Sequence, residues 1–227
     1  GHHIELERLK HALMNNEFVL YYQPKVNMRT GEVLGVEALI RWHHPARGIV
    51  PPDEFIPIAE NSGLIVDIGR DVRLGAMQTI LEMQERNWPI NLSVNVSTFE
   101  FWSHELQDAF VESFAAITEQ LEVTDFPYDR LTLEITESLL MKQHTYLIDV
   151  LNGLRVKGIK ISLDDFGTGY SSLSYLANFP IDQIKIDKSF IDRLAEGERH
   201  LALIEAIVRL SHALNLRVTA EGVETQE

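Results

Sequence analysis

The feature that most constrains the fold of this chain is a regular alternation of strand-like and helix-like segments after residue 90. Short runs with apolar residues at every second position occupy 91–97, 131–136, 160–165, 183–189 and 217–222, and a helical pattern follows each of the first four. Strands that alternate with helices predict parallel βαβ units, and their number predicts an α/β fold of the TIM-like (β/α)8 barrel type. A chain of 227 residues suits a single domain of that kind.

The first 90 residues follow a different pattern. A helical stripe covers 4–15, and two strand-like runs at 18–28 and 33–43 are joined by a turn at 29–31. So short a connection predicts an antiparallel hairpin. A loop rich in proline and glycine is expected over 45–52, and Asp53 is expected to cap a helix that ends near residue 61. Another helix is expected over 64–86.

One face of the predicted strands is persistently polar. In the run 91–97, for example, Leu92 and Val94 alternate with Ser93 and Asn95. A buried parallel strand is normally apolar on both faces, and the carboxyl ends of barrel strands are where catalytic residues gather. A half-exposed open sheet would explain serines and threonines, but not a charged or amide group on strand after strand. The groups expected to converge are Glu37, Asn95, Glu134, Asp164, Asp165, Lys185 and Glu221.

Asp164 and Asp165 stand at the end of one run and directly before a glycine-rich segment. Alternation places Asp164 on the polar face of its strand, while Asp165 lies beyond the alternation and needs the following loop to aim it. Two adjacent carboxylates repel each other, and burying them is costly unless a cation or protons neutralise them. An Asp-rich turn that caps a following helix is the structural alternative.

Several carboxylates and one amide oxygen form a hard-oxygen site that suits Mg²⁺ or Mn²⁺, whereas zinc would favour the histidines that these strand ends lack. Two ions about 3.5–4 Å apart, bridged by Asp164, would activate a water for phosphodiester hydrolysis. Lys185 could orient that water, neutralise charge on phosphorus, or be a structural lysine paired to a carboxylate. An enolase-like proton abstraction with Lys185 as base fits the same residue types.

Composition restricts the partners of the chain. The net charge of −14 argues against a surface for DNA or RNA polymers and against contact with anionic membranes. The lack of cysteine excludes disulfide and thiolate chemistry. No apolar run has the length of a membrane span and no signal peptide is visible, so a cytoplasmic setting is expected, with membrane tethering of a parent protein left open. We interpret 1–3 as a tag remnant and 4–227 as one domain.

Several short motifs identify a family. The tripeptide Glu37-Ala38-Leu39, within VEALIRW at 36–42, resembles the signature of the EAL domain, the bacterial cyclic di-GMP phosphodiesterases. Further motifs occur in the order typical of that family: YQP at 22–24, PDEFI at 52–56, NVS at 95–97, EITES at 134–138, DDFGTGYS at 164–171, KIDKSF at 185–190 and AEGVET at 220–225. The resemblance extends from about residue 4 to the last residue.

The resemblance implies a barrel whose first strand is antiparallel to the others. It implies hydrolysis of cyclic di-GMP to linear pGpG with two Mg²⁺ or Mn²⁺ ions per site. The metal ligands that it implies are Glu37, Asn95, Glu134, Asp164, Asp165 and Glu221. The catalytic residues are Lys185, which holds the attacking water, Glu37, and Glu221, which is either a general base or a metal ligand. Substrate contacts match Gln23, Arg41 and Asp187, and Glu137 matches the anchor of the loop after Asp165.

The resemblance also implies partners. Such domains often form homodimers, and the parent protein is expected to carry a sensory or diguanylate cyclase-type domain. Family members continue into a further helix and a last strand, so the last βα unit is expected to be absent from this chain. The alternative function is a catalytically inactive cyclic di-GMP receptor or interaction module. Because the expected metal ligands are all present in the sequence, an active enzyme is favoured.

Overall fold

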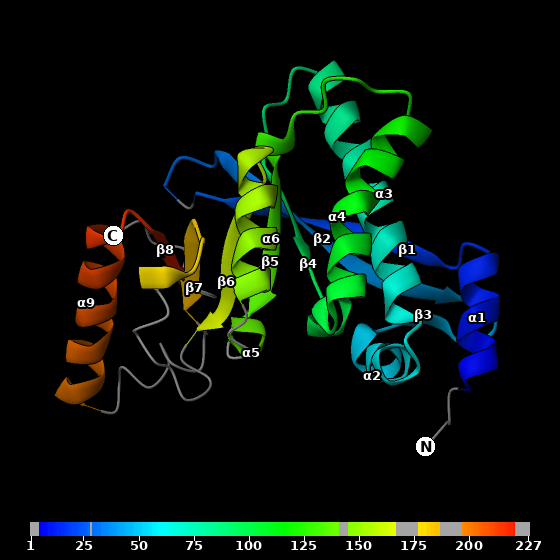
Figure 1. Cartoon of the computed structure of the whole chain (residues 1–227), viewed down its shortest axis with the longest axis horizontal. Coiled ribbons are helices and arrows are strands. Elements are labelled where there is room, and N and C mark those ends of the chain that lie inside the picture. The colour runs from blue at the N-terminus through cyan, green and yellow to red at the C-terminus, as the bar shows by residue number, and fades with distance from the viewer. Residues whose placement is uncertain (1–4, 28, 141–144, 167–176, 187–196, 221–227) are drawn as a thin grey trace.

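The computed structural model describes residues 5–27, 29–140, 145–166, 177–186 and 197–220. Its described strands form one curved sheet in the order β1-β2-β4-β5-β6-β7-β8, with β3 paired to β2 (Figure 1). The strands are β1 (Phe18–Val26), β2 (Val33–His44), β3 (Gly48–Val50), β4 (Leu92–Asn95), β5 (Leu131–Thr136), β6 (Lys160–Phe166), β7 (Gln183–Ile186) and β8 (Arg217–Ala220).

The helices are α1 (Leu6–Met14), α2 (Pro52–Ser62), α3 (Ile65–Glu85), α4 (His104–Gln120), α5 (Glu137–Leu140), α6 (Thr145–Val156) and α9 (Glu198–Ala213), with short 3-10 helices η1 (Thr98–Phe101) and η2 (Tyr128–Arg130). In Figure 1, α1 lies at one end of the molecule and α9 at the other, with α3, α4 and α6 between them along the sheet. None of the helices in the described part of the chain is both long and apolar enough to cross a lipid bilayer.

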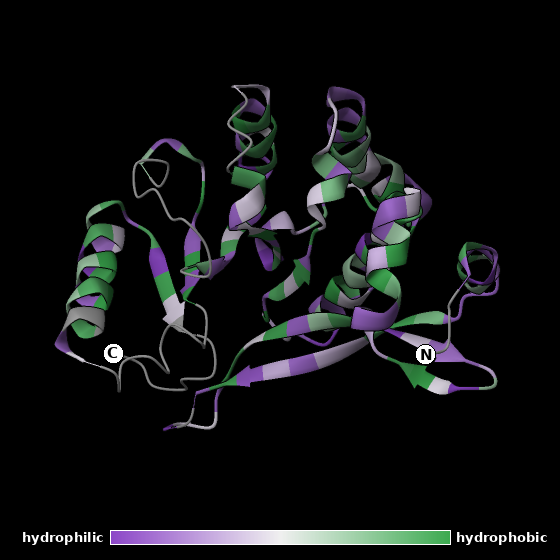
Figure 2. Cartoon of the chain, turned by 90° about the horizontal axis from the view of Figure 1, so that it is seen from below, coloured by the Kyte–Doolittle hydropathy of each residue, from purple (hydrophilic) through white to green (hydrophobic). Residues whose placement is uncertain are grey.

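The sheet is parallel except at its beginning. The neighbours along the path β2-β4-β5-β6-β7-β8 pair in parallel, whereas β1 and β3 each pair antiparallel with β2. The predicted hairpin and the parallel βαβ units are therefore confirmed. Figure 2 shows the β1–β2 hairpin running along one side of the molecule, with the helices standing on the other. Among the described residues, β1 and β8 are the two edges of the sheet.

The structure departs from the predicted elements in three places. Residues 48–50 form β3 against β2 where a loop is predicted, because Gly48 adopts a φ of 75° that lets the chain turn back. Helix α2 begins at Pro52, so the predicted cap Asp53 lies in its first turn and Pro51 holds the cap position. The strand expected over 91–97 ends at Asn95, since η1 follows almost at once. The short helix expected near residue 173 lies outside the described residues.

The two faces of the sheet differ in chemistry, as the alternation predicts. Apolar side chains such as Leu133 and Ile161 are buried in the main core beneath the helices. On the opposite face the buried side chains are polar, among them Thr132, Ser162 and Lys185. A second, smaller core packs α1 and α2 against the end of β2. The apolar face attaches the helices, and the polar face is free to line a site.

Helix α1 is tied to the barrel by one carboxylate. Glu17 is 8% exposed, and its Oε1 accepts hydrogen bonds from Arg8 Nη2 at 2.7 Å and from the indole N–H of Trp42 at 3.2 Å. Arg8 belongs to α1 and Trp42 to β2. The Arg8 guanidinium, with the help of Trp42, holds the pKa of Glu17 below its ordinary value despite burial. The ionised carboxylate therefore stabilises the folded chain.

A buried ion pair fixes the carboxyl end of β4. Arg73 Nη1 on α3 donates to Glu100 Oε1 at 2.7 Å, and each of the two side chains is 4% exposed. Glu100 Oε2 accepts from the backbone N–H of Ser97 at 3.1 Å, and Ser97 is the N-cap of η1. Because Ser97 follows Asn95 by two residues, this pair restrains the strand end that presents Asn95.

Replacing Glu17 with glutamine should flatten the acid dependence of stability. A lowered pKa in the folded state favours the ionised form, so the stabilisation is complete above the ordinary glutamate value of 4.5 and is lost as the pH falls below it. Denaturant unfolding at about pH 7 and about pH 3.5 measures the difference. Glu7→Gln is the matched control, because Glu7 is an exposed carboxylate of helix α1 that pairs with exposed Lys10. An equal loss on acidification in wild type and Glu17→Gln would contradict this assignment.

Replacing Gly69 with alanine should destabilise the protein. A Cβ at this position of α3 would lie 2.0 Å from Glu100 Oε1, so the carboxylate would have to leave its place beside Arg73. We expect the free energy of unfolding to fall by about 1–3 kcal/mol in denaturant titrations. The matched control is Gly153→Ala in α6, where a Cβ meets nothing within 4 Å and should stabilise by about 0.5–1 kcal/mol. Similar effects of the two substitutions would contradict the packing.

Candidate active site

Most of the predicted site residues lie on neighbouring strands near their carboxyl ends. Asn95 pairs in register with Glu134, and Thr136, two residues further along β5, pairs with Asp164. The structure places Gln23 on β1, Glu37 and Arg41 on β2, Asn95 on β4, Glu134 on β5, Glu137 at the start of α5, Asp164 and Asp165 on β6, and Lys185 on β7. Asp187 and Glu221 lie outside the described residues, as does the loop that Glu137 is predicted to anchor.

The centre of this set is a buried ion pair between Glu134 and Lys185. The Lys185 ammonium donates a short hydrogen bond to Glu134 Oε1. The side chain of Glu134 is 0% exposed and that of Lys185 is 9% exposed. The other oxygen, Glu134 Oε2, is buried and accepts no hydrogen bond from any described residue. Leaving a buried acceptor unsatisfied costs about 1–3 kcal/mol, so this atom is suited to a ligand.

The electrostatics of the pair keep the lysine charged. Burial opposes the charge on Lys185, but the carboxylates of Glu134, Asp164 and Glu37 outweigh burial and hold its pKa well above the ordinary value. Burial in turn raises the pKa of Glu134, which the Lys185 ammonium opposes. At neutral pH the lysine is therefore a permanent cation beneath the acidic strand ends.

Glu37 and Asn95 approach each other across the β2–β4 boundary. Asn95 Nδ2 donates to Glu37 Oε1 at 3.5 Å, a long contact that does not involve the amide oxygen of Asn95. Gln23 stands opposite Glu37 in the β1–β2 register and is exposed. These three side chains form one side of the site, with their oxygens available beside the Glu134–Lys185 pair.

Asp164 and Asp165 lie on a β-bulge. The β6–β7 register shifts between Leu163 and Phe166, and Asp165 has a φ of 56°, in the left-handed region that non-glycine residues seldom adopt. The backbone N–H of Asp165 donates to Asp164 Oδ1 at 2.9 Å. Strand β6 continues to Phe166, so Asp165 lies within the strand and the bulge positions it. A bulge releases two adjacent carboxylates from the alternation that would send them to opposite faces.

Two polar residues of the site are absent from the predicted set. Lys25 on β1 places its Nζ 3.6 Å from Glu134 Oε1. Ser162 pairs in register with Glu134, is 0% exposed, and its Oγ forms no hydrogen bond within the described ranges. The signal for Lys25 is present in the sequence, because it follows Gln23 by two residues and alternation puts both on one face.

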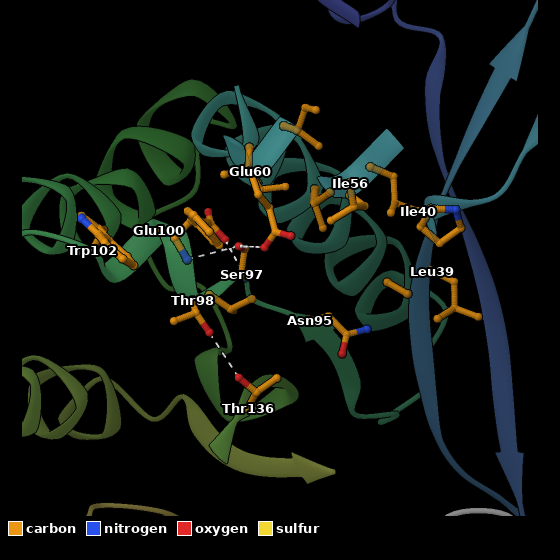
Figure 3. A pocket seen from close by; sticks show the side chains of 18 of the residues that line it. Leu39, Ile40, Ile56, Glu60, Asn95, Ser97, Thr98, Glu100, Trp102 and Thr136 are labelled. Atoms are coloured by element: carbon orange, nitrogen blue, oxygen red, sulfur yellow. Dashed lines mark hydrogen bonds between the residues drawn. The ribbon is translucent and has the colours of Figure 1, made fainter. Parts of the chain in front are cut away.

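A cavity of about 570 Å³ has Arg41 and Asn95 in its lining, whereas Glu37, Glu134 and Asp164 do not line it. Apolar side chains from α2, α3 and η1 form much of its wall, among them Ile56, Ile68, Val72 and Phe99. Figure 3 shows Glu60 and Ser97 pointing toward one another at this wall, where Ser97 Oγ donates to Glu60 Oε2 at 2.7 Å. A largely apolar hollow with a few placed polar groups is typical of small-molecule sites.

The donor chemistry of the site fits a divalent cation. Glu37, Asn95, Glu134 and Asp164 supply carboxylate and amide oxygens, which Mg²⁺ and Mn²⁺ prefer. The buried Glu134 Oε2, without a donor in the described part of the chain, is the atom that most clearly fits a cation. Within the described ranges, no three Asp, Glu or His side chains lie close enough together to hold one ion.

In sequence, the chain is similar to one part of several longer proteins. Residues 6–227 match the EAL domain family model. The oxygen sensor protein DosP of Escherichia coli (strain K12) is 44% identical over 220 residues, which are 96% of this chain and 27% of that protein. The cyclic di-GMP phosphodiesterase PdeR of the same organism is 41% identical over 217 residues, 96% of this chain and 32% of that protein. The chain thus spans about a third or less of these relatives.

Comparison with solved structures agrees with this family match. A solved structure of the PaMucR phosphodiesterase in complex with c-di-GMP is 41% identical and has a TM-score of 0.83, covering 97% of this chain and 87% of that one. EAL domains have a TIM-like barrel fold, which confirms the predicted fold class. The chain belongs to the EAL domain family.

Proposed function

We propose that this chain is a metal-dependent phosphodiesterase that hydrolyses cyclic di-GMP to linear 5'-pGpG in bacterial second-messenger signalling. The observation that supports this most directly is the gathering of carboxylate, amide and lysine groups around one buried ion pair on neighbouring strands: Glu37, Asn95, Glu134, Asp164 and Lys185. The PdeR relative is named for this activity, and the PaMucR structure contains c-di-GMP.

We propose that two Mg²⁺ or Mn²⁺ ions are held by Glu37, Asn95, Glu134, Asp164, Asp165 and Glu221. Such ions, when bound, would lower the pKa of a water and polarise the phosphodiester. The unsatisfied Oε2 of Glu134 supports its place in this set, and the bulge at Asp164 and Asp165 supports two adjacent carboxylates serving one centre. Glu221 is the general base or a further ligand.

Lys185 would act directly on the reacting atoms. Its ammonium has three N–H donors, of which one is used by Glu134, and its charge is secured by the carboxylates around it. The remaining donors can hold the attacking water or stabilise the charge that develops on the phosphate oxygens. A fixed cation in a largely buried position needs little reorganisation during the reaction.

The proposed substrate contacts are Arg41, Gln23 and Asp187, of which Arg41 lines the cavity. The Nη1 of Arg41 donates to the Ile40 carbonyl at 2.7 Å, which leaves the other guanidinium N–H groups for a phosphate. Gln23 is exposed beside Glu37 and suits the polar edge of a guanine, and Asp187 is a further contact in this proposal. The volume of about 570 Å³ lies within the range of roughly 300–1,000 Å³ usual for ligand pockets.

We further propose that the domain forms a homodimer and works in a parent protein with a sensory or diguanylate cyclase-type domain. The second point is supported by the relatives, since the chain covers 27% of DosP, an oxygen sensor protein. Glu137, 7% exposed at the start of α5, is the proposed anchor of the loop after Asp165.

Incubation with cyclic di-GMP and Mg²⁺ or Mn²⁺ should yield pGpG, measured by liquid chromatography, and excess chelator should abolish the product. Without a cation, the substrate phosphates would face unscreened carboxylates. Glu134→Gln, which keeps the shape of the side chain, is the matched variant and should lose turnover. Binding of cyclic di-GMP without hydrolysis at saturating metal would instead favour the inactive receptor, and the absence of binding would contradict both functions.

Replacing Lys185 with methionine should lower kcat on the order of 10²-fold and change KM little, because its charge acts on the reacting phosphate. Lys185→Arg should restore part of kcat, since it keeps the charge in a different geometry. Circular dichroism and denaturant unfolding of each variant identify any loss that comes from misfolding. A folded Lys185→Met variant with wild-type kcat would contradict the role of Lys185.

A further inference from the structure

Lys25 is a charged residue of the site that the proposed reaction does not use. It lies on the edge strand β1, and its Nζ is 3.6 Å from Glu134 Oε1. The same carboxylate oxygen accepts the short hydrogen bond from Lys185. Two lysines from opposite parts of the described sheet thus approach one buried oxygen, while the other oxygen of Glu134 has no donor among the described residues.

The two lysine side chains differ in how tightly the surrounding structure confines them near Glu134 Oε1. The side chain of Lys185 is 9% exposed and lies on β7, between β6 and β8. The side chain of Lys25 is 38% exposed, and the residue opposite it in the β1–β2 register is Gly35, which has no side chain to confine it. Burial and then the nearby Lys185 ammonium lower the pKa of Lys25, so the site holds its charge weakly, and the flexible side chain can turn toward solvent. Lys25 is therefore the looser of the two cations.

The charges around Glu134 explain why a second cation is present. Glu37, Glu134 and Asp164 all act electrostatically on Lys185, so at least three carboxylates surround one buried ammonium. Lys25 adds a second positive charge at the edge of this group. A divalent cation bound to the Glu134 carboxylate would supply two positive charges where Lys25 supplies one. It would also repel an ammonium only about 4 Å away.

We propose that Lys25 is the exchangeable counterion of this acidic centre, which neutralises Glu134 while no divalent cation is bound and is displaced into solvent when one binds. The inference rests on the metal site of the proposed function. Lys185 stays in place through the exchange, because its burial leaves it no path to water. Lys25 consequently competes with the cation and lowers the affinity of the site for it.

Calorimetric titration of Mn²⁺ into the 227-residue chain, without substrate, tests the exchange. Lys25→Met removes the competing charge at similar length, so the Kd for Mn²⁺ should fall on the order of fivefold. Saturating Mn²⁺ should therefore raise the melting temperature of Lys25→Met by more than that of wild type. Lys25→Arg keeps the charge and should retain a near wild-type Kd. Lys160→Met is the matched control, because Lys160 is exposed at the opposite end of β6.

The outcomes separate this inference from the proposed function. If wild type binds Mn²⁺ and Lys25→Met binds it with unchanged or weaker affinity, the counterion role is overturned while the metal site stands. If Lys160→Met tightens binding as much as Lys25→Met, the effect is one of net charge, and the exchange at Glu134 is again overturned. If neither wild type nor Lys25→Met binds Mn²⁺, both the metal-dependent function and the exchange fail. Tighter binding confined to Lys25→Met supports the exchange.

Discussion

The buried ion pair between Glu134 and Lys185 is the interaction on which the rest of the site depends. Taking two charges out of water carries a penalty that their attraction does not always recover, and an apolar pair of similar volume is often no less stable. Such a pair is therefore weak evidence for stability. Its value here is chemical: one oxygen of Glu134 is held by Lys185, and the other is left, buried, for a ligand. Lys25, Glu37 and Asp164 all act on this pair.

Two features of the fold position the site residues around that pair. The parallel strands bring Asn95, Glu134 and Asp164 to one end of the sheet, because the carboxyl ends of parallel strands meet there. The bulge in β6 then departs from regular strand geometry at the two aspartates, with Asp165 in a left-handed conformation. Backbone strain of this kind persists where the surroundings enforce it and is frequent at functional sites. Regular strand pairing brings these residues together, and the bulge in β6 changes the orientation of the two aspartates.

The cavity depends on packing outside the barrel. Helices α2 and α3 and the 3-10 helix η1 form its wall, and the Arg73–Glu100 pair beneath η1 holds these elements against the end of β4. Gly69 is required there because a side chain would occupy the place of Glu100. The same strand end carries Asn95, so the wall of the cavity and the edge of the acidic centre are fixed by one buried network.

The sequence by itself determined the alternation of strands and helices, the hairpin and the polar face that carries Glu37, Asn95, Glu134 and Lys185. These follow from local periodicity, since residues two apart in a strand share a face whatever surrounds them. The tertiary structure alone decided the short strand β3, the bulge at Asp165, and the approach of Lys25 to Glu134. The physical reason is that strand register, and the space that Gly35 leaves opposite Lys25, arise only when separate segments pair.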